Sequence, residues 1–384
     1  MTWRTYLGRT MTGDVGQEIP WTSGSVTHTL NDHDQIDVVT SLGALDGVSP
    51  EWCSPRSGTL IVTYTDGWGV ERIVSAGVID SPPKDDRRAR TTTFSARGVS
   101  GLLEDRIALD KEYEAGASLG LRTSKIVCKK QTYRAIMGTL VRAGLTKRNG
   151  WLPIITPPAE AGERSRTYAG YDVANNSVWA RVQELSEADG GPDFAFRAEW
   201  ADEEHTRFQW RLVAGSDAQA TLPQDGEVLW DATSRDGDVA TLEPVASDEK
   251  TAHRVYATGS GSGSTVGLEF AELETLTEFD PLVEKVVSAS SAEPNAGGVT
   301  MLVDVAKGAL ASSPIYQLSL QVHADPQRKP IGTWWCGELA LVAVDGWRTF
   351  PNGEFRLLAI SVKYTLGSNM VDVEFQEDYM AGGA

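Results

Sequence analysis

The sequence predicts a mainly β protein with α+β insertions, in which two antiparallel β-barrel domains flank a smaller inserted α+β domain. Short β-branched runs separated by turn signals fill the first and last thirds of the chain. Helical periodicity is concentrated in the middle third. With 384 residues, 41% of them hydrophobic, the chain is long enough for two or three cores. We predict domains at residues 1–110, 111–250 and 251–384.

The first third is predicted to form strands. The runs with β-branched, alternating character are Val26–Leu30, Thr59–Tyr64, Arg72–Ile79 and Thr91–Ser95. Asp66-Gly67 is a turn signal between two of them. After Gly98 the apolar period lengthens, which predicts a short helix before the domain ends near Asp110.

The middle third predicts two helices and two strands. An apolar stripe at Ile136, Met137, Leu140 and Val141 predicts a helix that ends at Gly144. The second helix is predicted from an N-cap at Ser177, apolar positions Val178, Val182 and Leu185, and a stop at 190–192. Strands are expected at 193–200 and 206–213, joined by an acidic turn at 202–205.

The last third returns to strands. A strand at 253–257 precedes the Gly- and Ser-rich stretch 259–264, which we interpret as a flexible turn or linker. A helix is expected at 299–310. The remaining predicted strands are 316–322, 338–344 and 356–364, separated by Asp-Pro, Asp-Gly and Asn-Gly turn signals.

The composition argues against several classes of protein. A net charge of -18 repels nucleic acid, so direct phosphate binding is not expected. Cys53, Cys128 and Cys336 are too far apart for a zinc motif or a disulfide framework, and we interpret them as reduced thiols. Residues 1–10 lack the apolar run of a signal peptide, and no stretch approaches the roughly 20 apolar residues of a membrane span. We therefore expect folding in a bacterial-type cytoplasm.

No catalytic, cofactor-binding or metal-binding residue is predicted. His28, Asp32, His33 and Asp34 form the densest group of metal-ligand types, but their spacing favours a polar turn between strands over a metal site. The stretch 259–267 lacks the Gly-Lys-Ser/Thr ending of a phosphate cradle. The serine clusters have no neighbouring histidine and lie in no Gly-x-Ser-x-Gly elbow.

Carboxylates and tryptophans leave alternatives open. We interpret Glu184 and Glu187 as solvated positions on a helix, and acid–base catalysis is the less favoured interpretation. Trp334, Trp335 and Trp347 are expected in a core or a subunit contact, and a carbohydrate-stacking face is the alternative.

Residues 122–166 are basic in an otherwise acidic chain. They hold ten basic and two acidic residues, a net charge of +8, whereas the remainder has 25 basic and 51 acidic residues, a net charge of -26. Aromatic residues that would stack on single-stranded bases are not interleaved with Arg122, Lys125, Lys129 and Lys130. The segment is better explained as a docking surface for an acidic partner or a neighbouring copy of the chain.

Three groups of motifs carry a family resemblance. They are Gly77-Val78-Ile79-Asp80 with residues 91–106 (TTTFSARGVSGLLEDR), residues 182–196 (VQELSEADGGPDFAF), and residues 332–337 (GTWWCG) with residues 350–353 (FPNG) and Arg356. In this order they resemble the tail-hub, or baseplate-hub, proteins of long-tailed bacteriophages, and especially the minor tail proteins of phages that infect actinobacteria. The motifs span most of the chain and contain no shared catalytic residue.

The resemblance implies two tail-tube-like β-barrel domains per chain and a homotrimeric ring whose six barrels match the sixfold tail tube. Such a ring lies at the tail tip of the virion, after folding and assembly in the host cytoplasm. It contacts the distal tail protein, the tape-measure protein and other minor tail or fibre proteins, and genomic DNA passes through it during ejection without specific binding. An acidic channel wall would repel that DNA.

Two other functions are alternatives, that of a tail-tip cell-wall hydrolase and that of a carbohydrate-binding receptor-recognition protein. Some hubs continue into C-terminal extensions that bind the host or cleave its wall. Because this chain ends soon after its last predicted strand, we expect those activities to belong to other proteins.

Overall fold

The computed structural model describes residues 2–114, 116–188, 190–247, 252–261, 263–272, 281–288, 299, 302–303, 305–307, 309–310, 315–348 and 350–377. It confirms a mainly β protein with a few helices. The chain separates into two compact units, residues 1–242 with 320–384, and residues 243–319. The division into segments 1–110, 111–250 and 251–384 stays a prediction about how the chain folds.

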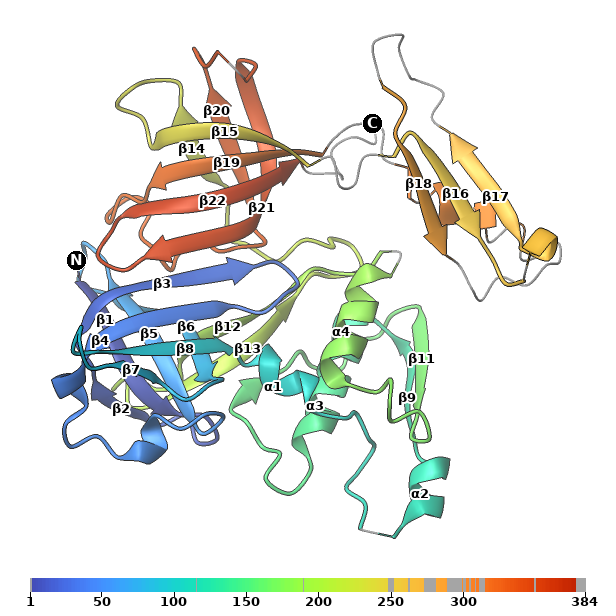
Figure 1. Ribbon diagram of the computed structural model, residues 1–384, viewed down its shortest axis with the longest axis horizontal. Coiled ribbons are helices and arrows are strands. Elements are labelled where there is room, and N and C mark those ends of the chain that lie inside the picture. The colour runs from blue at the N-terminus through green and yellow to red at the C-terminus, as the bar shows by residue number, and fades with distance from the viewer. Residues whose placement is uncertain are drawn as a thin grey trace. The chain divides into compact units, whose positions relative to one another are not determined.

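The largest element is a sheet of fourteen strands (Figure 1). Its main path runs in the order β15-β19-β22-β21-β3-β4-β8-β6-β5-β1-β2, with β14, β20 and β7 joined to it. The strands are β1 (Thr2–Arg9), β2 (Val15–Glu18), β3 (Trp21–Thr29), β4 (Gln35–Ser41), β5 (Gly58–Thr65), β6 (Glu71–Ile79), β7 (Lys84–Asp86), β8 (Thr91–Gly98), β14 (Val228–Ala232), β15 (Val239–Ser247), β19 (Ile315–His323), β20 (Leu339–Val344), β21 (Gly353–Thr365) and β22 (Met370–Glu377).

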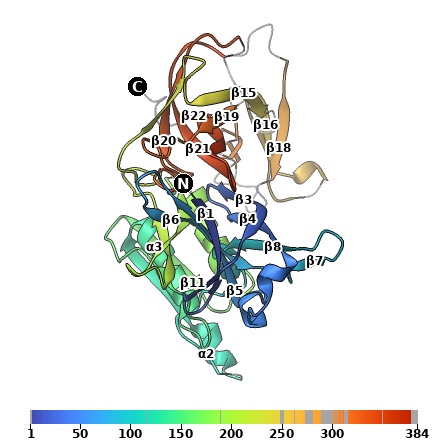
Figure 2. The ribbon, with the colours of Figure 1, turned by 90° about the vertical axis from the view of Figure 1, so that its left-hand side faces the viewer.

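Strands from opposite ends of the chain meet in this sheet. β21 pairs antiparallel with β3, in a register that sets Ser361 opposite Thr29 and Thr365 opposite Ser25. The view turned by 90° also shows the strands near the C-terminus, in red, next to β3 in blue (Figure 2). Backbone hydrogen bonds therefore join the two predicted β regions directly, and closure of either region into a barrel stays a prediction.

The strands predicted in the first third are confirmed, but not all of them alternate. β8 alternates between buried and half-buried residues, as expected for a strand with one covered face. β5 is buried at nearly every position. Ile61 of β5 belongs to a core that also holds Phe208 and Trp210 from the middle of the chain, so side chains from outside the predicted first domain cover one face of this strand.

Between residues 100 and 214, the described residues form four helices and five strands, and the strands make two sheets, β10-β13-β12 and β11-β9. The helices and strands are α1 (Ser100–Glu104), α2 (Ser118–Thr123), α3 (Tyr133–Leu145), α4 (Val178–Glu187), β9 (Lys125–Gln131), β10 (Ile154–Ile155), β11 (Arg164–Ala169), β12 (Phe194–Trp200) and β13 (Phe208–Ala214). The predicted apolar stripes of α3 and α4 are confirmed, because both are buried in one core with Phe194 and Leu212. α3 extends one residue beyond Gly144. Ser177 is the N-cap of α4, but its hydroxyl donates to the carbonyl of Glu104 at 3.0 Å instead of capping the helix.

The second unit holds a three-stranded sheet of β16 (Arg254–Thr258), β17 (Leu268–Glu272) and β18 (Glu284–Ser288). The Gly- and Ser-rich stretch is confirmed as a turn, because β16 and β17 pair antiparallel and the amide of Gly259 donates to the carbonyl of Gly267 at 2.7 Å. The predicted helix at 299–310 is confirmed where the structure describes it, because residues 299, 302–303 and 305–307 are helical. Within it, Leu302 and Ala306 are buried against Val255 and Ala257.

Short 3-10 helices lie at η1 (Leu42–Leu45), η2 (Pro50–Trp52) and η3 (Gly263–Thr265). None of the helices in the described ranges is long and apolar enough to cross a membrane.

Candidate functional site

A concave surface begins at the last turn of α3. The hydroxyl of Thr132 accepts a hydrogen bond from the amide of Ala135 at 3.3 Å and so caps the N-terminus of α3. The apolar stripe of the helix faces the core. Arg142 therefore projects from the opposite, exposed face, near the helix C-terminus, where a positive charge is favourable.

The strand β10 forms the floor beside this turn. The carbonyl of Pro153 accepts a hydrogen bond from the amide of Trp210 at 2.8 Å, and β10 then runs parallel to β13. In the order β10-β13-β12, β10 is the edge strand, and no strand in the described part of the chain pairs with its other side. An edge strand can accept an additional strand through its free backbone groups.

Together these elements enclose a groove of about 530 Å³, which we call the α3–β10 groove. The side chain of Trp151 is 54% exposed at its rim, although tryptophan is usually largely buried. The residues that line the groove are Thr12, Arg142, Leu145, Thr146, Trp151, Leu152, Pro153, Ile154, Ile155, Thr156, Ala201, Arg207, Phe208 and Gln209. The lining is mainly apolar, and its only charged side chains are two arginines.

The two arginines differ in their partners. Arg207 approaches the carboxylate of Asp14 at 3.5 Å. The guanidinium of Arg142 donates to the hydroxyl of Thr156 and to the carbonyl of Pro157, both at 2.7 Å. Among the described residues, no carboxylate lies within 4.0 Å of Arg142. An apolar surface beside a positive charge that has no carboxylate partner among the described residues is suited to binding a partner protein.

Other members of the basic segment are used inside the fold. Arg134 pairs with Glu160 at 2.8 Å. The guanidinium groups of Arg164 and Arg166 lie over the ring of Tyr133 at 4.8 and 5.5 Å. The predicted docking role of the segment stays a prediction, and Arg142 is the member that lies at the groove.

The polar turn predicted at residues 31–34 is confirmed between β3 and β4, whereas His28 lies in β3. His33 bonds the hydroxyl of Ser100 at 2.7 Å, and its ring stacks on Trp179 with 4.2 Å between centroids. His28 lies 2.9 Å from the carboxylate of Asp34. In the described ranges, no three His, Cys, Asp or Glu side chains are placed to hold a metal ion.

The tryptophans singled out in the sequence lie mainly in the interior. Trp334 is 4% exposed and contacts the edge of Trp230, with 5.1 Å between centroids. Trp335 is partly buried under the guanidinium of Arg197 at 5.3 Å. The indole of Trp347 donates to the carbonyl of Ala232 at 2.6 Å. The core reading is therefore confirmed for Trp334.

Sequence reasoning missed the two most exposed tryptophans, Trp68 and Trp151. A signal for Trp151 was present, because it follows Asn149-Gly150, a turn pair within the basic segment. The two carboxylates of α4 behave as predicted. Glu184 is exposed and pairs with Arg181 at 2.6 Å, and Glu187 is also exposed.

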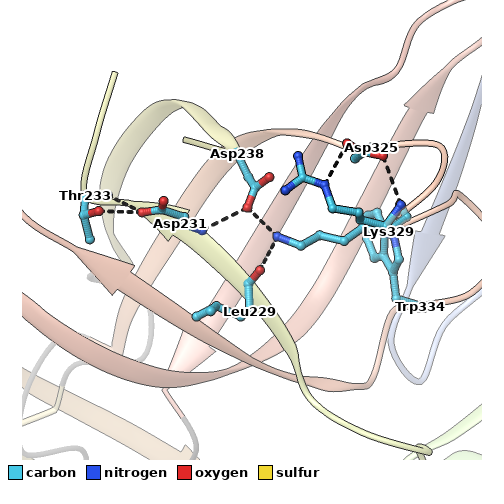
Figure 3. Close-up of polar contacts among 8 residues, drawn as sticks. Leu229, Asp231, Thr233, Asp238, Asp325, Lys329 and Trp334 are labelled. Carbon is cyan, nitrogen blue, oxygen red and sulfur yellow. Dashed lines mark hydrogen bonds and ion pairs between the residues drawn. The ribbon is translucent and has the colours of Figure 1, made fainter. Parts of the chain in front are cut away.

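A polar cluster around Lys329 joins β14 to the loop that precedes β20 (Figure 3). The ammonium group of Lys329 donates to the carbonyl of Leu229 and to the carboxylate of Asp238, and it lies 4.8 Å from the ring centroid of Trp230. Asp238 also accepts from the amide of Asp231 at 3.3 Å. These groups satisfy one another, so the cluster is a structural joint.

The same loop begins at Asp325, whose side chain is fixed by backbone donors. The amides of Arg328 and Gln327 donate to its carboxylate at 3.0 and 2.8 Å. These bonds, with the Arg328 side chain, lower the pKa of Asp325 to about 2. The carboxylate thus stays charged and holds the turn in place.

Residues that border the motif segments of the family resemblance hold these segments together, since Arg197 directly follows residues 182–196 and Glu338 directly follows residues 332–337. Arg197 of β12 pairs with Glu338 at 2.9 Å, and both side chains are largely buried. Burial raises the pKa of Glu338, although Arg197 opposes the increase. The amide of Val178 donates to the carbonyl of Arg106 at 2.7 Å, which joins α4 to the residues after α1. The motif segments therefore meet as parts of one folded unit.

The cysteines are free thiols. Cys128 and Cys336 are buried and Cys53 is partly buried. Burial raises the pKa of Cys128 and that of Cys336, which keeps both protonated and unreactive.

The fold is similar to that of two solved phage-related proteins. The tail protein from Neisseria meningitidis MC58 is 15% identical, with a TM-score of 0.55, and the match covers 98% of this chain and 97% of that one. The 43 kDa tail protein of prophage MuSo2 from Shewanella oneidensis is 15% identical, with a TM-score of 0.54, and the match covers 98% of both chains. No family model matches the sequence, and no curated protein matches it. At this identity the likeness establishes a shared fold.

Proposed function

We propose that this protein is a structural tail-hub, or baseplate-hub, component of a long-tailed phage. It forms a ring at the tail tip that connects the tail tube and distal tail protein to tip proteins and lets DNA pass during ejection. The observation that carries the proposal is the shared fold with two tail proteins over nearly the whole length of all three chains. The ordered sequence motifs support the same assignment, and they alone favour the actinobacteriophage type.

The ring contains three copies. Each copy contributes two tube-like β regions, so that six regions match a sixfold tail tube. The net charge of -18 supports a channel wall that repels the passing DNA. The role is structural, not enzymatic, and its partners are other copies, the distal tail protein, the tape-measure protein and other minor tail or fibre proteins. The protein resides in the virion after assembly in the host cytoplasm.

The ring is tested by native mass spectrometry of the purified protein. We expect a species of three times the 41.5 kDa chain mass. A species that stays monomeric at every concentration measured would contradict the ring. In an assembled ring, acidic side chains should line the bore, and a basic bore with the acids outside would contradict the proposed DNA passage.

The rival hydrolase function predicts a different result. Incubation of the purified protein with host cell walls should release no muropeptides. Release that disappeared after replacement of one specific carboxylate would replace the structural proposal with a catalytic one.

A further inference from the structure

The α3–β10 groove combines three properties that are typical of a binding surface. It is concave and mainly apolar, it has a half-exposed tryptophan at its rim, and it borders an edge strand. Tryptophan and arginine are also the residues that most often carry the binding energy of protein interfaces. Trp151 and Arg142 are both present here.

We infer that the α3–β10 groove is an interface between copies of this chain and receives an extended acidic segment of the neighbouring copy. This inference rests on the proposed ring and names the surface that would hold it together. The groove has room for side chains of such a segment, and β10 beside it is an edge strand of its sheet.

Charge complementarity selects a second copy as the occupant. Arg142 has no carboxylate partner within 4.0 Å among the described residues, and it belongs to a segment with a net charge of +8. The rest of the chain has a net charge of -26. A neighbouring copy therefore supplies the acidic surface that this basic groove lacks, and the contact is heterologous, with groove on one copy and acidic segment on the next. Contacts of this kind form a ring when the rotation from one copy to the next closes, and the proposed trimer has such a rotation.

The contribution of each groove residue can be separated. Trp151 supplies the apolar contact with the neighbouring copy. Trp151→Ala therefore reduces the apolar area that is buried at the interface, without changing the charge. Arg142 supplies the charge, so Arg142→Glu reverses it and repels the acidic segment. Both side chains are exposed in the single chain, so neither change removes a core side chain. Arg142 also donates to Thr156 and Pro157, so the folding of its variants is verified before association is measured. Arg142→Gln is a milder second variant that keeps hydrogen-bond donors.

The matched controls lie outside the groove. Trp68 is 70% exposed, so Trp68→Ala removes a tryptophan of similar exposure. Arg235 lies in an exposed turn after β14, so Arg235→Glu makes the same charge reversal elsewhere. Circular dichroism and the thermal midpoint verify that each variant is folded.

The experiment measures the apparent dissociation constant of the oligomer by sedimentation and native mass spectrometry for the wild type and the five variants. We expect Trp151→Ala and Arg142→Glu each to weaken association by about 30-fold or more, a smaller loss for Arg142→Gln, and values near wild type for both controls. High salt should weaken the association of the wild type. It should also reduce the difference in dissociation constant between the wild type and Arg142→Gln.

The possible failures are distinguishable. If the wild type assembles and the groove variants assemble equally well, the groove is not the interface, and the ring stands. If the controls weaken association as much as the groove variants, the effect is not specific to the groove, and the inference is again overturned. If the wild type itself remains monomeric, both the ring and the inference are wrong.

Discussion

Lys329 places a positive charge between an aromatic ring and a carboxylate. Its side chain is 19% exposed and that of Asp238 is 18% exposed, so solvent compensates little of either charge. The ring of Trp230 covers the ammonium group from another side at 4.8 Å. Each charge therefore depends on the other, and the loss of one partner leaves a nearly buried charge without compensation.

Replacement of Lys329 by Met tests this dependence. Methionine keeps most of the stem that packs on Trp230 but removes the charge, and we expect the free energy of unfolding to fall by about 2 kcal/mol. Chemical denaturation measures the change. The double variant Lys329→Met/Asp238→Asn should recover part of the loss, and additive losses in the two single variants would show that the residues are not coupled.

Asp325 makes the stability of the folded protein depend on pH. Its pKa is lowered to about 2, from about 4 in an unfolded chain, by backbone amides that bind the charged form. Because the folded pKa is the lower one, the stabilisation is fully present above about pH 4 and is lost as the pH falls towards 2. We expect Asp325→Asn to cost about 1 kcal/mol at pH 7, reduced for solvent screening. In denaturation experiments from pH 7 to pH 2, the free energies of unfolding of the wild type and of Asp325→Asn should converge. A constant difference between these free energies would contradict this assignment.

At the scale of an element, the turn between β3 and β4 is held by Asn31. Its backbone has a positive φ of 59°, which asparagine tolerates better than most residues. Its side chain donates to Asp193 at 2.7 Å and accepts from the amide of Phe194 at 2.8 Å. One residue thus shapes the hairpin and attaches it to the start of β12.

Asn31→Ala removes both functions of this side chain. The amide of Phe194 loses its acceptor and the backbone conformation becomes less favourable, so we expect a loss of about 2 kcal/mol in the free energy of unfolding. Asn31→Gly is the matched control, because it removes the hydrogen bonds but accepts the positive φ. It should lose less than the alanine variant, and a larger loss for glycine would show that the backbone conformation is unimportant.

At the scale of the whole molecule, the described residues of the two units form cores of different size. The core of residues 243–319 contains a small group of described residues, Ala252, Val255, Ala257, Leu302 and Ala306, and three of these are alanines. The other unit has extensive cores of larger side chains. Because buried apolar area is the main source of stability, the smaller unit should open more easily.

Hydrogen exchange followed by mass spectrometry measures this difference. We expect the amides of β16 to exchange with an opening free energy about 3 kcal/mol lower than those of β3 and β21. The pairing of β3 with β21 should make these two strands exchange together, although they lie near opposite ends of the chain. Independent exchange of the two strands would contradict one cooperative sheet.

The groove was only partly predictable. The sequence singled out the basic segment from its charge, and Trp151 carried a turn signal. The sequence contained no signal that Thr12 and Arg207 belong to the same surface, because they reach the groove through the pairing of distant segments. That none of the described carboxylates lies within 4.0 Å of Arg142 is likewise a property of three-dimensional packing.

By itself, the sequence determined the mainly β class, the positions of the strands predicted in the first third and the apolar stripes of α3 and α4. These features follow from apolar periodicity and turn chemistry, which act over a few residues. Only the tertiary structure decided that β21 pairs with β3 and that Lys329 meets Asp238. Such contacts join segments far apart in the chain, so they leave no local pattern, and the packing of the whole sheet selects them.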